Sequence, residues 1–421
     1  MIRLQTILVV SRGGRKLPII GGAPRLSMDY ARQLLLTHPD KYIINFVGNY
    51  PPEISSSHLV FHKINQTVNP RTRSQILYYL NAFLVDFLTT MKAIAVLLRH
   101  KEISLVHVNS NIGSIVIKTL FKRRIKLVYS LHDSYYHNSP TIKSYSKRII
   151  KLLNNRFLET LSLKSADAII AVSPIIAGEI KNKGNGKTFT LYPYPSLINY
   201  SKKENNNLKE SFKKFFKFED EYILSVGQQD GRKRFDRLIH GFSGLVDRRT
   251  LLVLVGDGPK HGDLVNLAFE LDLKERVIFL PNLTDELLFT LFKNAKLFVL
   301  VSETEGFPIA VIESVAIGTP AMLFVPGFNP LSFGFKNTAS LSLYDTMCSE
   351  DISIELNKIM KDITMSPGIV EDTIRVADEV FSFTAYGDKL HYIYENTLRK
   401  KGRKHKSNAI LGKEDKTYDS S

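Results

Sequence analysis

Hydrophobic and polar positions follow two alternating periods along the chain. Short β-branched and aromatic runs, such as residues 4–10, 105–109, 222–227 and 297–301, have the length and composition of buried strands. Each run is followed by a turn of glycine or polar residues and then by a segment with helical apolar spacing. Strands and helices that alternate in this way predict an α/β protein with doubly wound parallel sheets.

The length of 421 residues exceeds one ordinary core and predicts two domains. A stretch rich in lysine, asparagine and glutamate begins near residue 199 and has the composition of a linker. We therefore expect one domain over residues 1–198 and a second over residues 199–382. Residues 399–421 are basic and polar, cannot bury a core and are predicted to form a disordered tail.

Composition indicates a globular protein of a reducing compartment. Hydrophobic residues make up 44% of the sequence, which is enough for two cores. A single cysteine, Cys348, excludes an intrachain disulfide framework and indicates the cytosol. The N-terminal apolar run is too short for a secretory signal. Residues 76–98 form the longest apolar stretch, but they include an asparagine, an aspartate and a lysine, so we expect a packed or interfacial helix instead of a membrane span.

The formal net charge of +16 implies an anionic partner or location. Nucleic acid is disfavoured, because the sequence has no recognition motif, no zinc-ligand spacing and no aromatic-rich basic sheet pattern. An anionic membrane surface is the other candidate, and ordinary solvated helix faces explain the basic clusters equally well. The clusters comprise Lys118, Lys122, Arg123, Arg124 and Lys126, followed by Lys143, Lys147, Arg148, Lys151 and Arg156.

Residues 302–320, with the sequence SETEGFPIAVIESVAIGTP, contain the strongest candidate site. They follow the buried run 297–301, and Pro308 suits the first turn of a helix whose C-terminal cap is Gly318. The helix is expected to begin at residues 307–309, with its first N–H groups directed toward the preceding loop. Such N–H groups form an anion site.

Two glutamates flank this helix start. Glu305 lies in the loop, and Glu313 lies within the helix. Carboxylates accept paired hydrogen bonds from vicinal diols, and a sugar nucleotide carries a diol on each side of its diphosphate. In isolation the two acids would be a helix cap and a solvated side chain, so the functional interpretation depends on their shared context.

The run E-G-F-P-I-A-V-I-E, followed by A-I-G-T-P, resembles the signature of retaining GT-B glycosyltransferases of the family-4 type, also called glycosyl transferases group 1. The resemblance covers residues 1–398 and implies two Rossmann-like doubly wound domains that face each other across a cleft. It also implies that a helix at 383–398 crosses back to the first domain. Residues 192–195, Y-P-Y-P, depart from the Asn-Gly turn usual in the family.

The resemblance implies a donor-binding site on the second domain. Glu313 would bind the ribose hydroxyls, and Glu305 would act in catalysis by binding sugar hydroxyls near the anomeric carbon. The diphosphate would lie against the loop and helix start formed by Gly306, Phe307, Pro308 and Ile309.

A second donor element is expected after the strand that ends at Gly227. The family has an arginine directly after this glycine, where this chain has Gln228, and a lysine five residues further on, which Lys233 matches. Lys233 would neutralise the leaving diphosphate, and either Arg232 or Arg234 would replace the missing arginine electrostatically. Basic side chains at a helix start oppose the helix dipole, and a bound anion relieves that opposition.

Candidates in the first domain come from two loops. The pair Gly21 and Gly22 opens a helical segment and resembles the glycine-rich loop that faces the donor phosphates. His132 follows a strand in the sequence S-L-H-D and resembles the catalytic-site histidine that hydrogen-bonds the donor sugar. Asp133 and His107 are weaker candidates at strand ends.

The implied function is transfer of a hexosyl group, with retention, from a UDP- or GDP-sugar to a glycan or lipid-linked acceptor in cell-surface polysaccharide assembly. No Asp-x-Asp element occurs in a strand-end context, so we expect no metal and no other cofactor. The expected location is the cytoplasm, with a peripheral site on the inner face of the cell membrane as a further option.

Two other classes stay open at the level of sequence. One is a catalytically idle sugar-nucleotide-binding partner of another transferase, motivated by Gln228. The other is a nucleic-acid-binding protein, motivated by the net charge. The donor base and sugar, the acceptor, the linkage and the oligomeric state are not determined by the sequence.

Overall fold

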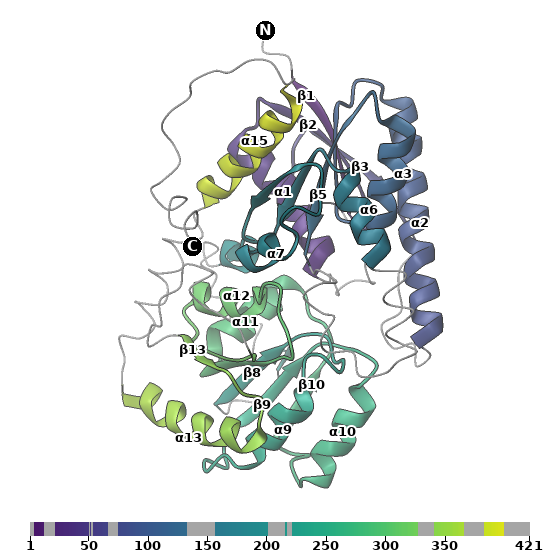
Figure 1. Cartoon of the computed structure of the whole chain (residues 1–421). Coiled ribbons are helices and arrows are strands. Elements are labelled where there is room, and N and C mark those ends of the chain that lie inside the picture. The colour runs from purple at the N-terminus through teal and green to yellow at the C-terminus, as the bar shows by residue number, and fades with distance from the viewer. Residues whose placement is uncertain are drawn as a thin grey trace, which may run out of the picture.

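The structure of the chain is a computed structural model that contains two parallel β-sheets flanked by helices, as Figure 1 shows. This arrangement confirms the predicted α/β class. The residues described are 4–11, 22–49, 51, 54–65, 75–132, 156–200, 215–216, 221–326, 341–365 and 383–399.

The first sheet has seven parallel strands in the order β3-β2-β1-β4-β5-β6-β7. Ile7 in β1 lies opposite Ile44 in β2 and Leu105 in β4, so the strand order reverses on either side of β1. Ligands of doubly wound sheets bind outside the carboxyl ends of the strands at such a reversal. The strands are β1 (Gln5–Val10), β2 (Tyr42–Gly48), β3 (Leu59–Lys63), β4 (Leu105–Val108), β5 (Lys126–Leu131), β6 (Ala168–Ala171) and β7 (Lys187–Thr190).

Helices cover both faces of the first sheet because successive side chains of a strand point to opposite faces. In β1, Ile7 and Val9 pack in one hydrophobic cluster with residues of α1 and α15, whereas Leu8 and Val10 pack in another with residues of α2, α3 and α6. The helices are α1 (Gly22–Thr37), α2 (Gln75–Arg99), α3 (Asn111–Phe121), α6 (Phe157–Ser165), α7 (Pro174–Glu179) and α15 (Phe383–Leu398).

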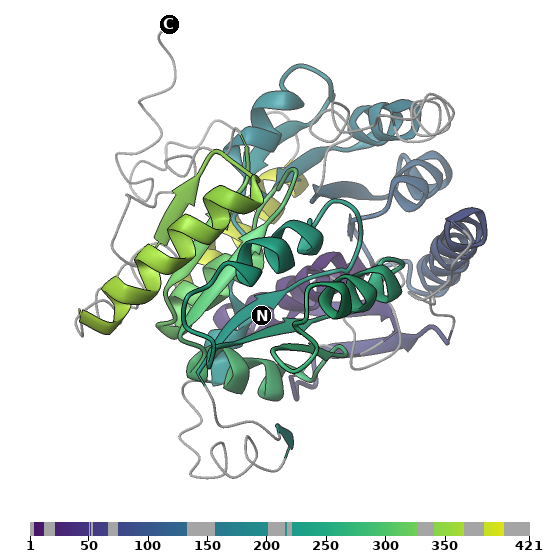
Figure 2. The same ribbon diagram turned by 90° about the horizontal axis from the view of Figure 1, so that it is seen from below.

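The second sheet has six parallel strands in the order β10-β9-β8-β11-β12-β13, and its order reverses between β8 and β11. Helices α9, α10 and α13 cover one face, while α11 and α12 cover the face turned toward the first domain (Figures 1 and 2). The strands are β8 (Tyr222–Val226), β9 (Leu251–Val255), β10 (Val277–Leu280), β11 (Leu297–Val301), β12 (Ala321–Phe324) and β13 (Leu341–Tyr344). The helices are α9 (Phe235–Ser243), α10 (His261–Glu270), α11 (Asp285–Asn294), α12 (Ile309–Ile317) and α13 (Ser349–Met365).

The predicted helix after the central loop is present as α12. Pro308 is its N-cap, and Gly318 closes it in the left-handed conformation with φ of 97°. Glycine adopts this conformation without the steric cost of a Cβ atom, which explains why the helix ends there. The helix start and the C-terminal cap expected from the sequence are therefore both confirmed.

The domain boundaries stay predictions, although the strands of the two sheets fall within residues 5–190 and 222–344. Most of the expected linker, residues 201–214 and 217–220, lies outside the described residues, as do the tail residues 400–421.

Helix α15 belongs spatially to the first domain although it follows the second in sequence. Tyr394 of α15 is fully buried, and its hydroxyl lies 2.6 Å from Nδ1 of His107 in β4. Nε2 of His107 lies 2.5 Å from the hydroxyl oxygen of Ser130 in β5. The His107 ring also stacks on Tyr30 of α1, so this histidine is a core residue that fastens α15 to the sheet.

We predict that His107 makes the fold sensitive to acid. Burial lowers the pKa of His107 to about 3, below the ordinary value of 6.5. The unfolded chain therefore binds an extra proton between these two values, and the associated stability is present above pH 6.5 and lost as the pH falls toward 3. Urea unfolding should show a slope of stability against pH that is shallower in His107→Gln by up to about 1.4 kcal/mol per pH unit. An unchanged slope, or the same change in the exposed control His240→Gln, would contradict this role.

Candidate active site

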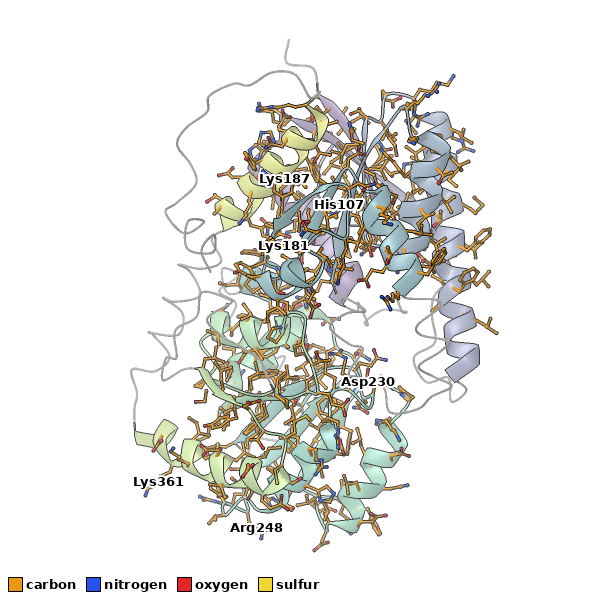
Figure 3. The ribbon with its side chains drawn as sticks, in the orientation of Figure 1. His107, Lys181, Lys187, Asp230, Arg248 and Lys361 are labelled. Carbon is orange, nitrogen blue, oxygen red and sulfur yellow. The ribbon has the colours of Figure 1, made fainter. Side chains whose placement is uncertain are left out.

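The site is built from two loops of the second domain that follow neighbouring strands. The loop after β8 carries the sequence Q-Q-D-G-R-K-R, and the loop after β11 carries S-E-T-E-G-F-P. Because β8 and β11 are hydrogen-bonded neighbours, the two loops meet at the reversal point of the sheet. The N–H of Glu303 donates to the carbonyl of Arg232 over 2.9 Å, which joins them directly. Asp230 of the first loop lies on the side of this domain that faces the other one (Figure 3).

Glu305 is the buried carboxylate on which the two loops converge. Its side chain is only 6% exposed, and its Oε1 lies 2.6 Å from Nζ of Lys233 and 3.3 Å from Nη1 of Arg232. Burial acts to raise the pKa of Glu305, but Lys233 and Arg232 outweigh it and hold the pKa below the ordinary value. The carboxylate is thus kept ionised between two cations.

The side chain of Asp230 and two glycines hold the loop after β8, the cationic loop, in place. Oδ1 of Asp230 accepts hydrogen bonds from the N–H groups of Arg232 and Lys233, at 3.0 and 3.1 Å. The stem of Lys233 lies against Gly227, and a Cβ atom there would meet it at 3.6 Å, an ordinary contact. The tighter requirement is at Gly256, which has φ of 139° and whose Cβ would lie 1.9 Å from the carbonyl oxygen of Gly227.

The three cations of the R-K-R run pair with three different carboxylates. Arg232 and Lys233 contact Glu305, whereas Arg234 pairs with Asp236 at 2.6 Å and with Glu303 at 3.3 Å. Arg234 therefore supports the loop and leaves the other two cations for the central carboxylate. The sequence alone did not distinguish Arg232 from Arg234 as the substitute for the missing arginine.

The start of α12 completes the site on the side of the second sheet that faces the first domain. Phe307, directly before the N-cap residue Pro308, is buried and stacks on Tyr192 of the first domain, with ring centroids 5.8 Å apart. The Y-P-Y-P stretch that departs from the family pattern thus provides a contact across the domains. Sequence reasoning missed Tyr192, because only the structure brings it to the loop.

Glu313 also lies at the contact between the domains. Nη2 of Arg25, in α1, is 3.1 Å from Oε1 of Glu313 and 3.4 Å from Oδ2 of Asp285, and Nε of Arg25 donates to the hydroxyl of Ser196 over 2.9 Å. Burial raises the pKa of Glu313 to about 7 despite the opposing effect of Arg25. Burial likewise raises the pKa of Asp29, one turn after Arg25, to about 7.

The first-domain candidates lie at the carboxyl edge of the first sheet. His132 directly follows β5 and is half-buried, and Gly22 is the first residue of α1. Gly21 and Asp133 lie outside the described residues. The proposed roles of these residues stay predictions. Within the described parts of the chain, no group of three or more His, Cys, Asp or Glu side chains is arranged to hold a metal ion.

The fold and the site define a class of protein. Two parallel α/β domains with this topology form the GT-B fold, and two neighbouring loops of the second domain bring together a helix start, a buried glutamate and two cations. Family models agree in both domains: the model described as Glycosyltransferase Family 4 matches residues 46–193, and the model described as Glycosyl transferases group 1 matches residues 206–362. The chain belongs to this glycosyltransferase family.

Proteins of similar sequence include two that are named glycosyltransferases and one that is named a synthase. The chain is 25% identical to an uncharacterized glycosyltransferase of Haemophilus influenzae and 24% identical to an N-acetyl-alpha-D-glucosaminyl L-malate synthase of Bacillus anthracis, and each match covers 72% of this chain and 77% of the relative. It is also 24% identical to the O-antigen biosynthesis glycosyltransferase WclY of Escherichia coli, over 54% of this chain and 64% of that protein.

Solved structures confirm the GT-B fold. Sucrose-phosphate synthase from Thermosynechococcus elongatus aligns with a TM-score of 0.69 at 18% identity, over 94% of this chain and 99% of that one. HepE from Anabaena, in complex with UDP and glucose, aligns with a TM-score of 0.66 at 16% identity, over 93% of this chain and 100% of that one.

We predict that Lys233 and Glu305 are energetically coupled. Lys233→Met should lower the free energy of unfolding by about 3 kcal/mol, because it removes one partner of a buried ion pair. In the double variant Lys233→Met/Glu305→Gln most of this loss should be recovered, since no buried carboxylate then lacks its lysine. Urea unfolding of the four proteins of the cycle measures the coupling. Lys260→Met is the matched control, because its pair with Asp263 is exposed and should contribute under about 1 kcal/mol; additive single effects at Lys233 and Glu305 would refute the coupling.

We also predict that Arg25 stabilises the protein more at high pH than at low pH. The raised pKa of Glu313 means that its carboxyl is protonated near pH 5.5 and ionised near pH 8. The stability that comes from burying the neutral carboxyl is lost as the pH rises through about 7, and the ionised carboxylate then depends on Arg25 as its partner. Arg25→Met should therefore destabilise the protein by at least about 1 kcal/mol more at pH 8 than at pH 5.5. Thermal and urea unfolding at both pH values measure the difference. The double variant Arg25→Met/Glu313→Gln should largely remove it, and a pH-independent loss would disprove the link.

Proposed function

We propose that the protein is a retaining glycosyltransferase that moves a hexosyl group from a UDP- or GDP-sugar to a glycan or lipid-linked acceptor in cell-surface polysaccharide assembly. The observation that carries the proposal is the contact of Glu305 with Lys233 and Arg232 beside the start of α12. In this proposal Glu305 is the sugar-binding carboxylate, and Lys233 and Arg232 supply the positive charge for a leaving diphosphate. The complex of HepE with UDP and glucose and the O-antigen role in the name of WclY support the donor and the pathway class.

Each part of the site has a task in this mechanism. The acceptor hydroxyl attacks the anomeric carbon from the face that the diphosphate leaves, so the configuration is retained as one C–O bond forms and the other breaks, and the hydroxyl proton passes to the departing phosphate oxygen. Negative charge develops on the leaving diphosphate, and Lys233, Arg232 and the N–H groups at the start of α12 stabilise it. Glu305 orients the sugar hydroxyls, Glu313 binds the ribose diol, and His132 hydrogen-bonds the sugar from the first domain. A metal ion is not required, because these cations already neutralise the diphosphate.

Donor binding changes the partners of both glutamates in this mechanism. In the described structure Lys233 contacts Glu305 and Arg25 contacts Glu313. The diphosphate competes with Glu305 for Lys233, and the ribose diol competes with Arg25 for Glu313. The enzyme would act in the cytoplasm, at the inner face of the cell membrane, where the net charge of +16 favours anionic lipid.

Donor-dependent turnover tests the function. Purified protein should be stabilised thermally by one UDP- or GDP-sugar and should hydrolyse or transfer it equally well with EDTA. Glu305→Gln and Lys233→Met should each lower kcat/KM by about 10² to 10³, because each removes a charge that acts on the reacting sugar or diphosphate. Glu303→Gln, two residues before Glu305, and Arg234→Met, one residue after Lys233, are the matched controls. Both variants should keep activity within about tenfold of that of the unchanged protein.

The donor assay, together with a nucleic-acid-binding assay at several salt concentrations, separates the alternatives. Donor binding without turnover would favour the catalytically idle partner suggested by Gln228. Steeply salt-dependent nucleic-acid binding without any response to sugar nucleotides would favour the nucleic-acid-binding protein. Loss of activity on addition of EDTA would overturn the metal-independent mechanism.

A further inference from the structure

The outward side of helix α2 is apolar, which is the reverse of the usual pattern for a surface helix. Its large side chains recur at intervals of three, four and seven residues and are 40–60% exposed. Side chains at this spacing lie on one face of a helix. We call this face the α2 stripe, and it consists of Leu80, Phe83, Leu84, Phe87, Met91 and Leu98.

The opposite side of α2 is packed against the domain. Val85, Ala93 and Leu97 are buried, and α2 contacts β1, β2 and α3. Residues 80–99 are long and apolar enough to cross a membrane by length and composition alone. The buried side fixes α2 to the sheet, so the α2 stripe is a surface of the folded domain and the helix is not a separate span.

Basic side chains gather at the C-terminal end of the α2 stripe. Nη2 of Arg124, which follows α3, donates to the carbonyl oxygen of Leu97 in α2 over 2.6 Å, so the ends of these two helices adjoin. Four exposed cations lie within a few residues of this contact: Arg99, Lys101, Lys122 and Arg123.

Acidic groups in this region are withdrawn from the surface or paired. Asp86 of α2 and Glu159 of α6 are both buried. The carboxylate of Glu102, in the loop after α2, lies 2.9 Å from Nδ1 of His100. Two lysines of the sequence clusters, Lys118 and Lys126, pair with Asp167, so they belong to the domain structure and do not add to the exposed basic group.

We propose that the α2 stripe, with the four cations at its end, binds the surface of an anionic lipid bilayer. An apolar strip beside a mainly basic surface, in which the exposed carboxylate of Glu102 contacts His100, fits the boundary between acyl chains and anionic headgroups. A second protein partner would need acidic groups arranged to match, whereas lipid headgroups supply negative charge without a fixed geometry. The proposal rests on the membrane location proposed above and names the face that makes the contact.

The position of α2 fits this task. Figures 1 and 2 both place α2 at the outer edge of the first domain, on the opposite side of the molecule from the second-domain helix α13. Contact through this face leaves the second domain, with its donor-binding loops, in solution. The acceptor-side domain would thus lie at the bilayer, where a lipid-linked acceptor is found.

Vesicle binding of the full-length protein tests the proposal. Cosedimentation with phosphatidylcholine vesicles, with and without phosphatidylglycerol, should show binding only to the anionic vesicles. Phe83→Glu/Phe87→Glu should lower the partition coefficient by about tenfold or more, because it places two charges in the apolar contact. Val265→Glu/Phe269→Glu is the matched control, since these exposed side chains have the same spacing on α10 of the second domain, and it should bind as the unchanged protein does.

Lys122→Gln/Arg123→Gln tests the charges. This variant should bind the anionic vesicles more weakly than the unchanged protein does, and added salt should reduce its binding by a smaller factor. Donor hydrolysis in vesicle-free solution is measured for every variant and should stay unchanged, so failure of docking is distinguished from failure of the proposed catalytic function. Equal binding to neutral vesicles, or equal loss in the α10 control, would overturn the proposal. So would a stable dimer that Phe83→Glu/Phe87→Glu dissociates while vesicle binding is absent, because the α2 stripe would then be an interface between two copies.

Discussion

The central constraint in this structure is the burial of the Glu305 carboxylate. A charge removed from water is costly unless it is paired, and two cations from another loop provide the pairing. This need joins the loops after β8 and β11, and it explains why the cationic loop is fixed by Asp230 and by closely packed glycines. In the proposed mechanism the same two cations stabilise the departing diphosphate, so the pairing that stabilises the folded loop would also preorganise the site.

A second set of charges connects the domains. Arg25 reaches from the first domain to two acids of the second, and Tyr192 stacks on Phe307 at the start of α12. Both contacts involve the central motif, so the arrangement of the domains is coupled to the residues that would bind the donor. The carboxyl of Glu313 has a raised pKa because burial outweighs one shared arginine, and a ligand that offers hydroxyl donors would compete for it on favourable terms.

The basic side chains of this protein fall into two groups, those paired with carboxylates and those exposed at the surface. Part of the positive charge pairs with half-buried or buried carboxylates, as at Lys118 and Lys126 with Asp167 and at Lys233 with Glu305, and contributes to the domain structure or the site. Another part lies exposed at the end of α2, next to side chains that a soluble surface normally avoids. The net charge alone could not separate these uses, because the distinction depends on which acid, if any, each lysine or arginine meets after folding.

The sequence by itself determined the local features. The alternation of strand and helix periods fixed the α/β class, and Pro308 and Gly318 fixed the limits of α12, because capping depends on the backbone preferences of single residues. The family resemblance predicts roles for Glu305 and Glu313 from one short motif and for Lys233 from the loop after Gly227, and these roles stay predictions. The tertiary structure decided which residues meet across long separations: Arg25 with Glu313, Tyr192 with Phe307, and Tyr394 with His107. It also decided that α2 has one buried and one exposed apolar side, because a helix that is apolar all round has no preferred outward face until a sheet covers one of them.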